Sequence, residues 1–338
     1  MKCDIIIPVW NQMAFTKDCL ESIKKNTDGD DWRLIIVDNA SDLETKNYLE
    51  GVKDSGEMPL ILVRNEENLG FIKAVNQGMS ASDAPFVCLL NNDTLVTKGW
   101  LMEMIRIAES AGDIGIVNPS SNNLGQKPAT GEPIELYAEC FRQEAGRCVE
   151  LGAAIGFCML IKRELIRKIG LFDEIYGMGN FEDTDFSRKA VAEGYRCVRA
   201  CGAYVYHREN SSFGKVKTFS KDFERNKEIF EFRWGKPKRI AYILDHYDNN
   251  VMKRLEADSI RLARSGNRVW FFLKDDVVVP SHSNILIVAA GKGNFYITTM
   301  FRILTKKKRF SEIFVGGQRF GKFLEAFSFI HKAKVRYY

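Results

Sequence analysis

The chain has 338 residues, of which 45% are hydrophobic and 28% charged, and its formal charge at pH 7 is +5. This composition excludes a disordered chain, and the length favours two domains. Because the positive charge is so weak, we expect no nucleic-acid partner. The eight cysteines show neither disulfide-framework nor zinc-site spacing. No secretory leader or membrane-spanning apolar run is visible, so we expect a reduced protein in the cytoplasm, soluble or peripheral at the inner face of the membrane.

Short apolar runs alternate with amphipathic segments through the first 120 residues. The runs suit strands buried on both faces, and the segments between them repeat apolar residues at helical spacing. Such alternation predicts parallel strands joined by right-handed helical crossovers, that is, a three-layer α/β/α sandwich around a mainly parallel sheet. The expected strands are 3–9, 34–37, 60–63, 86–90 and 114–117, and the expected helices are 15–25, 44–52, 71–79 and 100–111.

Polar residues follow the expected strands at their C-terminal ends: Asn11, Asp38, Asn65 and Asn91. Parallel strands bring these ends to one edge of the sheet, where open α/β sheets bind ligands. Asn91, Asn92 and Asp93 directly follow the 86–90 strand; a carboxylate there can hold a hard divalent cation, and an amide can bond a sugar or ribose hydroxyl. Asn and Asp are also common turn residues, so this motif alone leaves a plain turn open.

Further candidates lie between residues 118 and 207. The polar loop 118–133 predicts either a substrate-facing flap or a connector, and 151–161 predicts a strand that leads to a helix at 163–169. Glu182 and Asp183 begin a helix that runs to about 193, and His207 follows strands expected at 195–200 and 203–206. A carboxylate early in a helix also complements the helix dipole, and a lone histidine is more often a hydrogen-bonded group than a ligand.

A domain boundary is expected at 233–239, where Gly, Pro and basic residues gather. The α/β pattern then restarts, with strands at 240–244, 269–273, 285–288 and 313–315 and helices at 253–265 and 295–304. We therefore expect domains at 1–235 and 236–338, the second being a small Rossmann-like α/β unit. The turn after its first strand lacks a Gly-rich phosphate fingerprint, so dinucleotide binding is not supported.

Six short motifs lie on this pattern in a fixed order: IIIPVWN at 5–11, VDNAS at 37–41, NLG at 68–70 with NQG at 76–78, LNND at 90–93, FEDTD at 181–185, and His207. Together they resemble the family 2 glycosyltransferases of the GT-A fold. The resemblance implies that residues 1–235 transfer a sugar, with inversion, from a nucleotide-diphosphate donor (a UDP- or dTDP-sugar) to a hydroxyl of a glycan or lipid-linked acceptor in polysaccharide synthesis. It also implies a divalent metal, Mn or Mg, as cofactor.

The resemblance assigns a role to each motif by its position. Asp183 is the implied catalytic base, with Glu182 as the alternative, and Asp93 and His207 are the implied metal ligands. The implied donor-binding residues are Pro8, Asp38, Asn68, Lys73, Asn91 and Asn92, with Asp38 on the nucleobase. Asn91 stands where the acidic form of the family's Asp-x-Asp motif has its first Asp, which leaves one charge fewer and is expected to lower the affinity for metal.

Two other functions remain open at this point. A sugar-nucleotide pyrophosphorylase would need a Gly-rich, Arg-containing loop after the first strand, where this chain has PVWN at 8–11. A non-catalytic nucleotide-sugar-binding module would keep the fold while losing the metal ligand or the base, yet Asp93, Asp183 and His207 are all present.

Residues 238–338 faintly resemble the N-terminal half of a GT-B glycosyltransferase, through the segments 239–245 and 266–269. This resemblance implies an auxiliary or truncated domain. The basic run at 306–309 suits a solvated charged face or, as the alternative, contact with an anionic membrane or lipid-linked acceptor.

Overall fold

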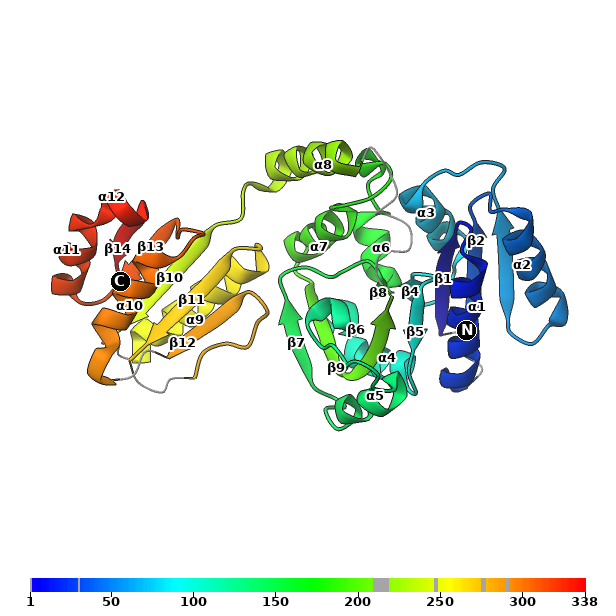
Figure 1. Ribbon diagram of the computed structural model, residues 1–338, viewed down its shortest axis with the longest axis horizontal. Coiled ribbons are helices and arrows are strands. Elements are labelled where there is room, and N and C mark those ends of the chain that lie inside the picture. The colour runs from blue at the N-terminus through cyan, green and yellow to red at the C-terminus, as the bar shows by residue number, and fades with distance from the viewer. Residues whose placement is uncertain (1, 30, 209–218, 246–248, 275–277, 290–291) are drawn as a thin grey trace. The chain divides into compact units, whose positions relative to one another are not determined.

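A computed structural model describes residues 2–29, 31–208, 219–245, 249–274, 278–289 and 292–338 of the protein (Figure 1). The chain divides into two compact units, one made of Met1–Val149 and Ala153–Trp234 and the other of Glu150–Gly152 and Gly235–Tyr338. Each unit has its own sheet and its own buried core. Of the helices formed by the described residues, none is long and apolar enough to cross a membrane.

The first unit is built on a mixed sheet with the strand order β3-β2-β1-β4-β8-β6-β9-β5, and β7 pairs with β9. Its strands are β1 (Cys3–Val9), β2 (Trp32–Asp38), β3 (Leu60–Arg64), β4 (Phe86–Leu90), β5 (Thr94–Val96), β6 (Ile114–Ser120), β7 (Cys148–Leu151), β8 (Cys158–Lys162) and β9 (Arg196–His207). Its helices are α1 (Met13–Asn26), α2 (Leu43–Ser55), α3 (Phe71–Ala81), α4 (Trp100–Glu109), α5 (Ile134–Arg142), α6 (Arg163–Ile169), α7 (Glu182–Ala192) and α8 (Phe219–Trp234).

Strands β1 to β4 run parallel and end at the same edge of the sheet. Strand β8 is antiparallel to both β4 and β6, and β5 is antiparallel to the end of β9. The predicted α/β sandwich is thus confirmed, with the antiparallel pairs confined to the second half of the sheet. Ile5, Ile6 and Ile7 of β1 are all fully buried, because successive side chains point to opposite faces and both faces are covered.

The single strand predicted at 151–161 is wrong: β7 ends at Leu151 and β8 begins only at Cys158. Between these strands, the Asn118 side chain takes the place of a backbone partner. Its Oδ1 accepts from the Ile155 N–H at 2.9 Å, and its Nδ2 donates to the Ile155 carbonyl at 2.8 Å. A buried side-chain amide therefore satisfies backbone groups that a strand ladder would otherwise bond.

The two strands predicted at 195–200 and 203–206 are one continuous strand, β9. Gly202, which falls in the gap between the two predicted strands, lies inside it. A Cβ at this position would stand 2.6 Å from the Cα of Ala145. The glycine is therefore required by the close approach of another backbone segment and does not end the strand.

The second unit contains a fully parallel sheet with the strand order β12-β11-β10-β13-β14. Its strands are β10 (Arg239–Leu244), β11 (Arg268–Leu273), β12 (Ile285–Ala289), β13 (Glu312–Val315) and β14 (Lys334–Tyr337). Its helices are α9 (Asn249–Arg264), α10 (Phe295–Thr305), α11 (Gln318–Ala326) and α12 (Ser328–His331). The prediction of a second, Rossmann-like α/β sheet agrees with this order, although α11, α12 and β14 were not predicted.

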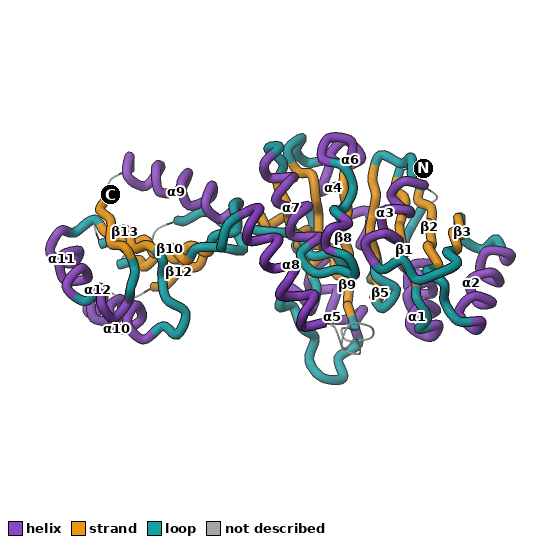
Figure 2. The backbone as a smooth tube through the Cα atoms, turned by 90° about the horizontal axis from the view of Figure 1, so that it is seen from above, coloured by secondary structure: helices purple, strands orange, loops and turns teal. Residues whose placement is uncertain are grey.

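Helices cover the second sheet on both faces (Figure 2). Helix α9 packs Met252 and Leu255 on one face, and α10 and α11 pack Phe295, Ile303 and Leu324 on the other. The sheet thus separates two small apolar cores, as expected for a parallel sheet.

Candidate active site

The short strand β5 brings three predicted site residues together. It pairs with the end of β9 so that Thr94 lies opposite His207. As a result, the Nε2 atom of His207 lies 3.0 Å from the Oδ1 atom of Asp93 and 3.4 Å from the Nδ2 atom of Asn91. Asn92 points elsewhere, because its Nδ2 donates to the Thr16 hydroxyl of α1 at 2.9 Å.

Loop residues that the sequence did not single out hold the imidazole of His207 in place. The ring stacks on Phe157 with 5.2 Å between centroids. The Asn122 side chain bonds both the N–H and the carbonyl of His207, at 2.9 and 2.7 Å, and Nδ2 of Asn123 lies 2.6 Å from His207 Nδ1. Both asparagines come from the polar loop predicted as a flap or connector, so that loop contributes to the site.

The orientation of the Asn123 amide decides which nitrogen of His207 carries the proton. Among the described residues, the buried Oδ1 atom of Asn123 has no hydrogen-bond partner. When Asn123 Nδ2 donates to Nδ1, the Nε2–H of His207 donates to Asp93. Exchanging the amide O and N lets that oxygen accept from Nδ1–H, and the Nε2 lone pair then faces Asp93, which is favourable with a cation between them. This is the tautomer in which a histidine ligates a metal, with its second nitrogen bonded to an outer group.

The second candidate group, Glu182 and Asp183, lies at the start of α7. Asn180 and Phe181 just before it have positive φ angles, 75° and 74°, which are costly for residues with a side chain. The buried Asn226 of α8 supports this turn, because its Nδ2 donates to the carbonyls of Tyr176 and Gly179, both at 2.8 Å. Helix α8 therefore helps to fix the backbone from which the two carboxylates project.

Asp185, on the buried side of α7, is a structural anchor for the same helices. Its carboxylate accepts from Arg233 and Trp234 of α8, both at 2.8 Å, and forms an ion pair with Lys189 at 3.0 Å. The Tyr176 hydroxyl also donates to this carboxylate, at 3.1 Å, so Asp185 ties α7 to α8 and to the segment before α7.

The two carboxylates at the start of α7 have different surroundings. Asp183 accepts from the Gly156 N–H at 3.0 Å and from the Thr184 N–H at 2.6 Å. Glu182 is buried, and its Oε2 has no hydrogen-bond partner among the described residues. Burial, followed by the charge of Asp183, raises the pKa of Glu182 to about 8. Burial also raises the pKa of Asp183, but the hydrogen bonds from Gly156 and Thr184 act against that rise.

A two-residue segment before β8 connects this pair to the histidine group. Gly156 donates its N–H to Asp183, while the carbonyl of Phe157 accepts the Asn91 N–H at 2.8 Å and its ring stacks on His207. Asp183 and the Asp93–His207 pair are thus held through neighbouring residues of one segment. In the sequence, small and apolar residues are the only signal for this segment.

The predicted donor-binding residues near β2 and β3 are bonded within and between the turns that follow these strands. Asp38 is buried; its Oδ1 accepts from the Ser41 N–H at 2.9 Å, and its Oδ2 pairs with Arg64. The side-chain Oδ1 atom of Asn68 accepts from the Asn39 side chain at 2.7 Å and from the Gly70 N–H at 2.9 Å. Of the other two, Pro8 is half-buried in β1, and Lys73 is exposed on α3.

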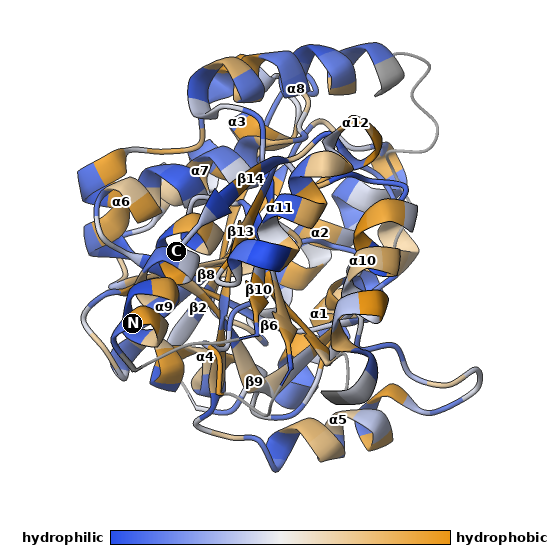
Figure 3. Cartoon of the chain, turned by 90° about the vertical axis from the view of Figure 1, so that its left-hand side faces the viewer, coloured by the Kyte–Doolittle hydropathy of each residue, from blue (hydrophilic) through white to orange (hydrophobic). Residues whose placement is uncertain are grey.

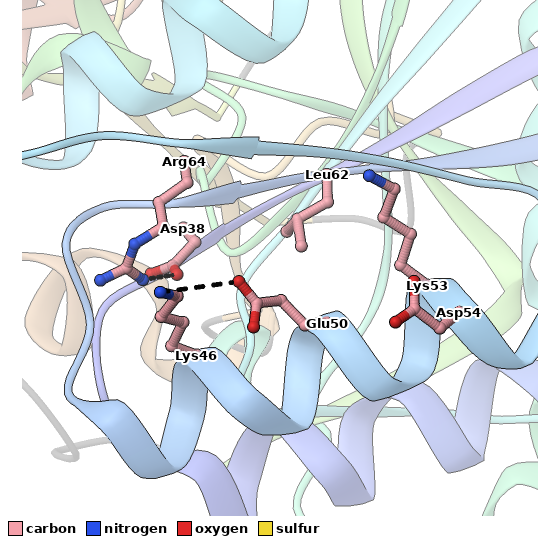
Figure 4. A pocket seen from close by; sticks show the side chains of 7 residues that line it. All are labelled: Asp38, Lys46, Glu50, Lys53, Asp54, Leu62 and Arg64. Carbon is pink, nitrogen blue, oxygen red and sulfur yellow. Dashed lines mark hydrogen bonds and ion pairs between the residues drawn. The ribbon is translucent and has the colours of Figure 1, made fainter.

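A polar pocket of about 340 Å³ opens beside Asp38 (Figure 4). Helix α2 forms one wall, where Lys46 pairs with Glu50 at 3.7 Å, and the Asp38–Arg64 pair closes one end. The lining residues are Asp38, Lys46, Glu50, Lys53, Asp54, Leu62 and Arg64. Arg64 was not predicted as a site residue, because its contact with Asp38 depends on the register of β2 with β3.

Comparison with known proteins identifies the class to which this fold and site belong. Residues 4–170 match the model of the family described as "Glycosyl transferase family 2". The first unit therefore contains a family 2 glycosyltransferase domain.

Curated relatives share about a quarter of their residues with this chain. An uncharacterized protein of Sinorhizobium fredii is 26% identical over 250 residues, which cover 68% of this chain but 27% of that protein. The uncharacterized glycosyltransferase YwdF of Bacillus subtilis is 27% identical over 211 residues, covering 61% of this chain and 74% of the relative. The succinoglycan biosynthesis protein ExoU of Rhizobium meliloti is 26% identical over 197 residues, covering 55% of this chain and 56% of the relative.

Solved structures agree with this fold at lower identity. TarS of S. aureus, residues 1–349 in complex with UDP-GlcNAc, has a TM-score of 0.53 at 16% identity, and the match covers 76% of this chain and 71% of that one. GalNAc-T7 with UDP, GalNAc and Mn²⁺ has a TM-score of 0.54 at 15% identity, and the match covers 68% of this chain and 48% of that one. At such identities the likeness concerns the fold alone.

Proposed function

We propose that the chain is a metal-dependent, inverting glycosyltransferase that moves a sugar from a UDP- or dTDP-sugar to a hydroxyl of a glycan or lipid-linked acceptor in polysaccharide synthesis. The observation that carries the proposal is the connection of Asp183, through Gly156 and Phe157, to the Asp93–His207 pair. The UDP-GlcNAc in TarS, the UDP and Mn²⁺ in GalNAc-T7 and the role of ExoU in succinoglycan biosynthesis support it.

Asp93 and His207 are the residues that would hold the divalent cation. A carboxylate oxygen and an imidazole nitrogen 3.0 Å apart can become neighbouring ligands of Mn²⁺ or Mg²⁺ after a small shift, once the Nε2 lone pair faces Asp93. When bound, the ion would neutralise charge that develops on the leaving diphosphate. Among the described residues, no group of three His, Cys, Asp or Glu side chains meets, so this two-ligand site leaves positions for phosphate oxygens.

Asp183 is the residue we assign as the base. As the bond from the anomeric carbon to the diphosphate oxygen breaks, the acceptor oxygen bonds that carbon and passes its proton to the Asp183 carboxylate. The Gly156 and Thr184 N–H groups favour the charged form of Asp183, whereas Glu182 keeps its proton near pH 7 because its pKa is about 8. One base opposite the leaving group gives inversion, since retention by double displacement would need a second carboxylate in line.

The remaining assignments belong to the same proposal. Pro8, Asp38, Asn68, Lys73, Asn91 and Asn92 would contact the donor at the edge where β1 to β4 end. Residues 1–235 would form the catalytic domain and 236–338 an auxiliary Rossmann-like domain, in a protein of the cytoplasm. We expect residues 1–235 to fold alone; an insoluble 1–235 protein beside a stable full chain would show that the two share a core.

A donor panel tests the proposed function directly. Thermal unfolding of the full chain is measured with UDP-, dTDP- and GDP-sugars in the presence of Mn²⁺ or Mg²⁺. A donor at 100 times its Kd should stabilise the fold by about 2.7 kcal/mol, and we expect this effect for a UDP- or dTDP-sugar with metal. Stabilisation without donor hydrolysis or transfer would identify a binding module, and the absence of stabilisation by every donor would contradict the proposal.

A further inference from the structure

One face of the second unit exposes large apolar side chains. We name it the aromatic face and define it by Ile297 and Phe301 of α10, Phe323 of α11 and Phe329 of α12. Ile297, Phe301 and Phe329 are 67%, 64% and 72% exposed. Soluble proteins seldom gather exposed apolar groups in this way unless the surface contacts a partner or a membrane. Figure 3 shows apolar colouring on α10 and α12 of this unit.

The helices hold these side chains outward while other residues fill the core. Ile297 and Phe301 are four residues apart and therefore lie on one side of α10, while Phe295 and Ile303 of the same helix are buried against the sheet. Rings continue from α11 to α12, with Phe323 and Phe327 4.7 Å apart and Phe327 and Phe329 6.2 Å apart. On the other side, the ring of Tyr296 in α10 lies 4.9 Å from that of Phe320 in α11, and Phe320 lies 6.4 Å from Phe323, so ring contacts join the three helices.

The same part of the chain is strongly basic. Residues 295–338 contain ten Lys or Arg and two Asp or Glu, which gives this segment a formal charge of +8. Because the whole chain has a formal charge of +5, residues 1–294 together carry −3. Lys307, Lys308 and Arg309 are exposed directly after α10. Lys306 differs from them, because its Nζ packs 4.4 Å from the Trp270 ring centroid.

From this combination we propose that the aromatic face and the basic run Lys307–Arg309 bind the surface of a bilayer that contains anionic lipids. The apolar side chains would enter the interfacial region and the cations would contact the headgroups. A charge of +8 disfavours burying the face against a second copy of the chain, because the two copies would repel each other. The proposal goes beyond sugar transfer and does not depend on it.

Co-sedimentation of the full chain with vesicles tests the proposal. The vesicles are made of phosphatidylcholine alone or with one third phosphatidylglycerol. We expect binding to the anionic vesicles, weak binding to the neutral ones, and a loss of binding in high salt, because the attraction between charges is screened. Equal binding to both compositions, or to neither, would overturn the proposal.

Two variants and a matched control locate the surface. The triple change Lys307→Glu, Lys308→Glu and Arg309→Glu should weaken partitioning by about a hundredfold or more, since each basic residue near an anionic surface contributes roughly fivefold. Phe301→Ser with Phe329→Ser should weaken binding while leaving the charge unchanged. The control changes the total charge by the same amount at three exposed positions of the first unit: Lys25→Glu, Lys98→Glu and Arg167→Glu. This control should bind the vesicles almost as the native chain does.

The remaining outcomes decide between other partners. If the control loses as much binding as the basic-run variant, net charge alone is responsible and the surface is wrongly assigned. If single-stranded RNA binds through Phe301 and Phe329 while vesicles do not, the face recognises nucleic acid. Concentration-dependent dimerisation that these two changes abolish, without vesicle binding, would make it an interface between copies of the chain.

Discussion

The first unit contains two acidic sites, and their surroundings place opposite demands on charge. Just after β4, Asp93 lies 3.0 Å from the Nε2 atom of His207, whose imidazole can ligate a metal. At the start of α7, Glu182 lies beside Asp183, and burial together with that like charge raises the pKa of Glu182 to about 8. The Asp93–His207 pair therefore favours the binding of a cation. The Glu182–Asp183 pair favours the retention of a proton on Glu182. Acidic residues in one sheet can therefore be set for different chemistry by their neighbours.

The largest expected effect is the loss of the proposed base, Asp183. Asp183→Asn keeps the size of the side chain and most of its hydrogen bonding but cannot accept a proton. We expect sugar transfer to fall by roughly 10²- to 10⁴-fold while donor and metal bind with near-native affinity. Transfer rates and donor Kd values measured on one preparation check this. Glu182→Gln is the matched control and should lower the rate of sugar transfer less than Asp183→Asn does. If Glu182→Gln lowers it more, the roles of the two carboxylates are exchanged.

At the other acidic site, Asp93→Ala should lower metal-dependent turnover by about a hundredfold or more without unfolding the chain, because a charge stabiliser is lost. Titration of turnover with Mn²⁺ is the measurement, and His207→Ala should raise the Mn²⁺ requirement in the same assay. Unchanged activity of Asp93→Ala at saturating metal would remove Asp93 from the site.

A smaller effect should come from the residue that orients His207. Asn123→Ala removes the side chain that bonds Nδ1 of His207, and we expect Mn²⁺ affinity to fall by about tenfold or more. Asn123→Asp, which can only accept a hydrogen bond, should keep the affinity. Calorimetric titration of Mn²⁺ and the ring nitrogen shifts of His207 give two readouts that need no substrate. Equal affinities of the Ala and native proteins would show that Asn123 only packs against the ring.

The smallest effect concerns stability and the proton on Glu182. Because the folded-state pKa of about 8 exceeds the unfolded value of 4.5, the folded chain binds more protons between these values, and its stability falls as pH rises through that range. Glu182→Gln should therefore be more stable than the native chain at pH 9, by at least about 1 kcal/mol, with a smaller difference at pH 5. Urea unfolding at several pH values measures this. Glu44→Gln, a change at an exposed position, is the control. An equal gain in stability at pH 9 in this variant would show that net charge, and not the burial of Glu182, is responsible.

The sequence predicted well what depends on local pattern and poorly what depends on register. Apolar runs followed by polar residues located β1 to β4 and their shared edge. The contact between Asp93 and His207 was inferred only through family resemblance, because β5, which creates it, is three residues long. The pairing of Arg64 with Asp38 and the bonds from Asn118 to Ile155 join residues far apart in sequence, and no local pattern encodes them. Gly156 acts through its backbone N–H, which every residue except proline possesses.

The support that α8 gives to α7 has a practical consequence for shortened versions of the protein. Asn226, Arg233 and Trp234 bond the turn before Glu182 and the buried Asp185. A chain cut after β9 would keep every strand of the first sheet but would lose these bonds, leaving the Asp185 carboxylate without two of its donors. For expression and crystallisation, the C-terminal limit of a catalytic fragment should therefore lie beyond Trp234, even though residues 4–170 are enough to recognise the family.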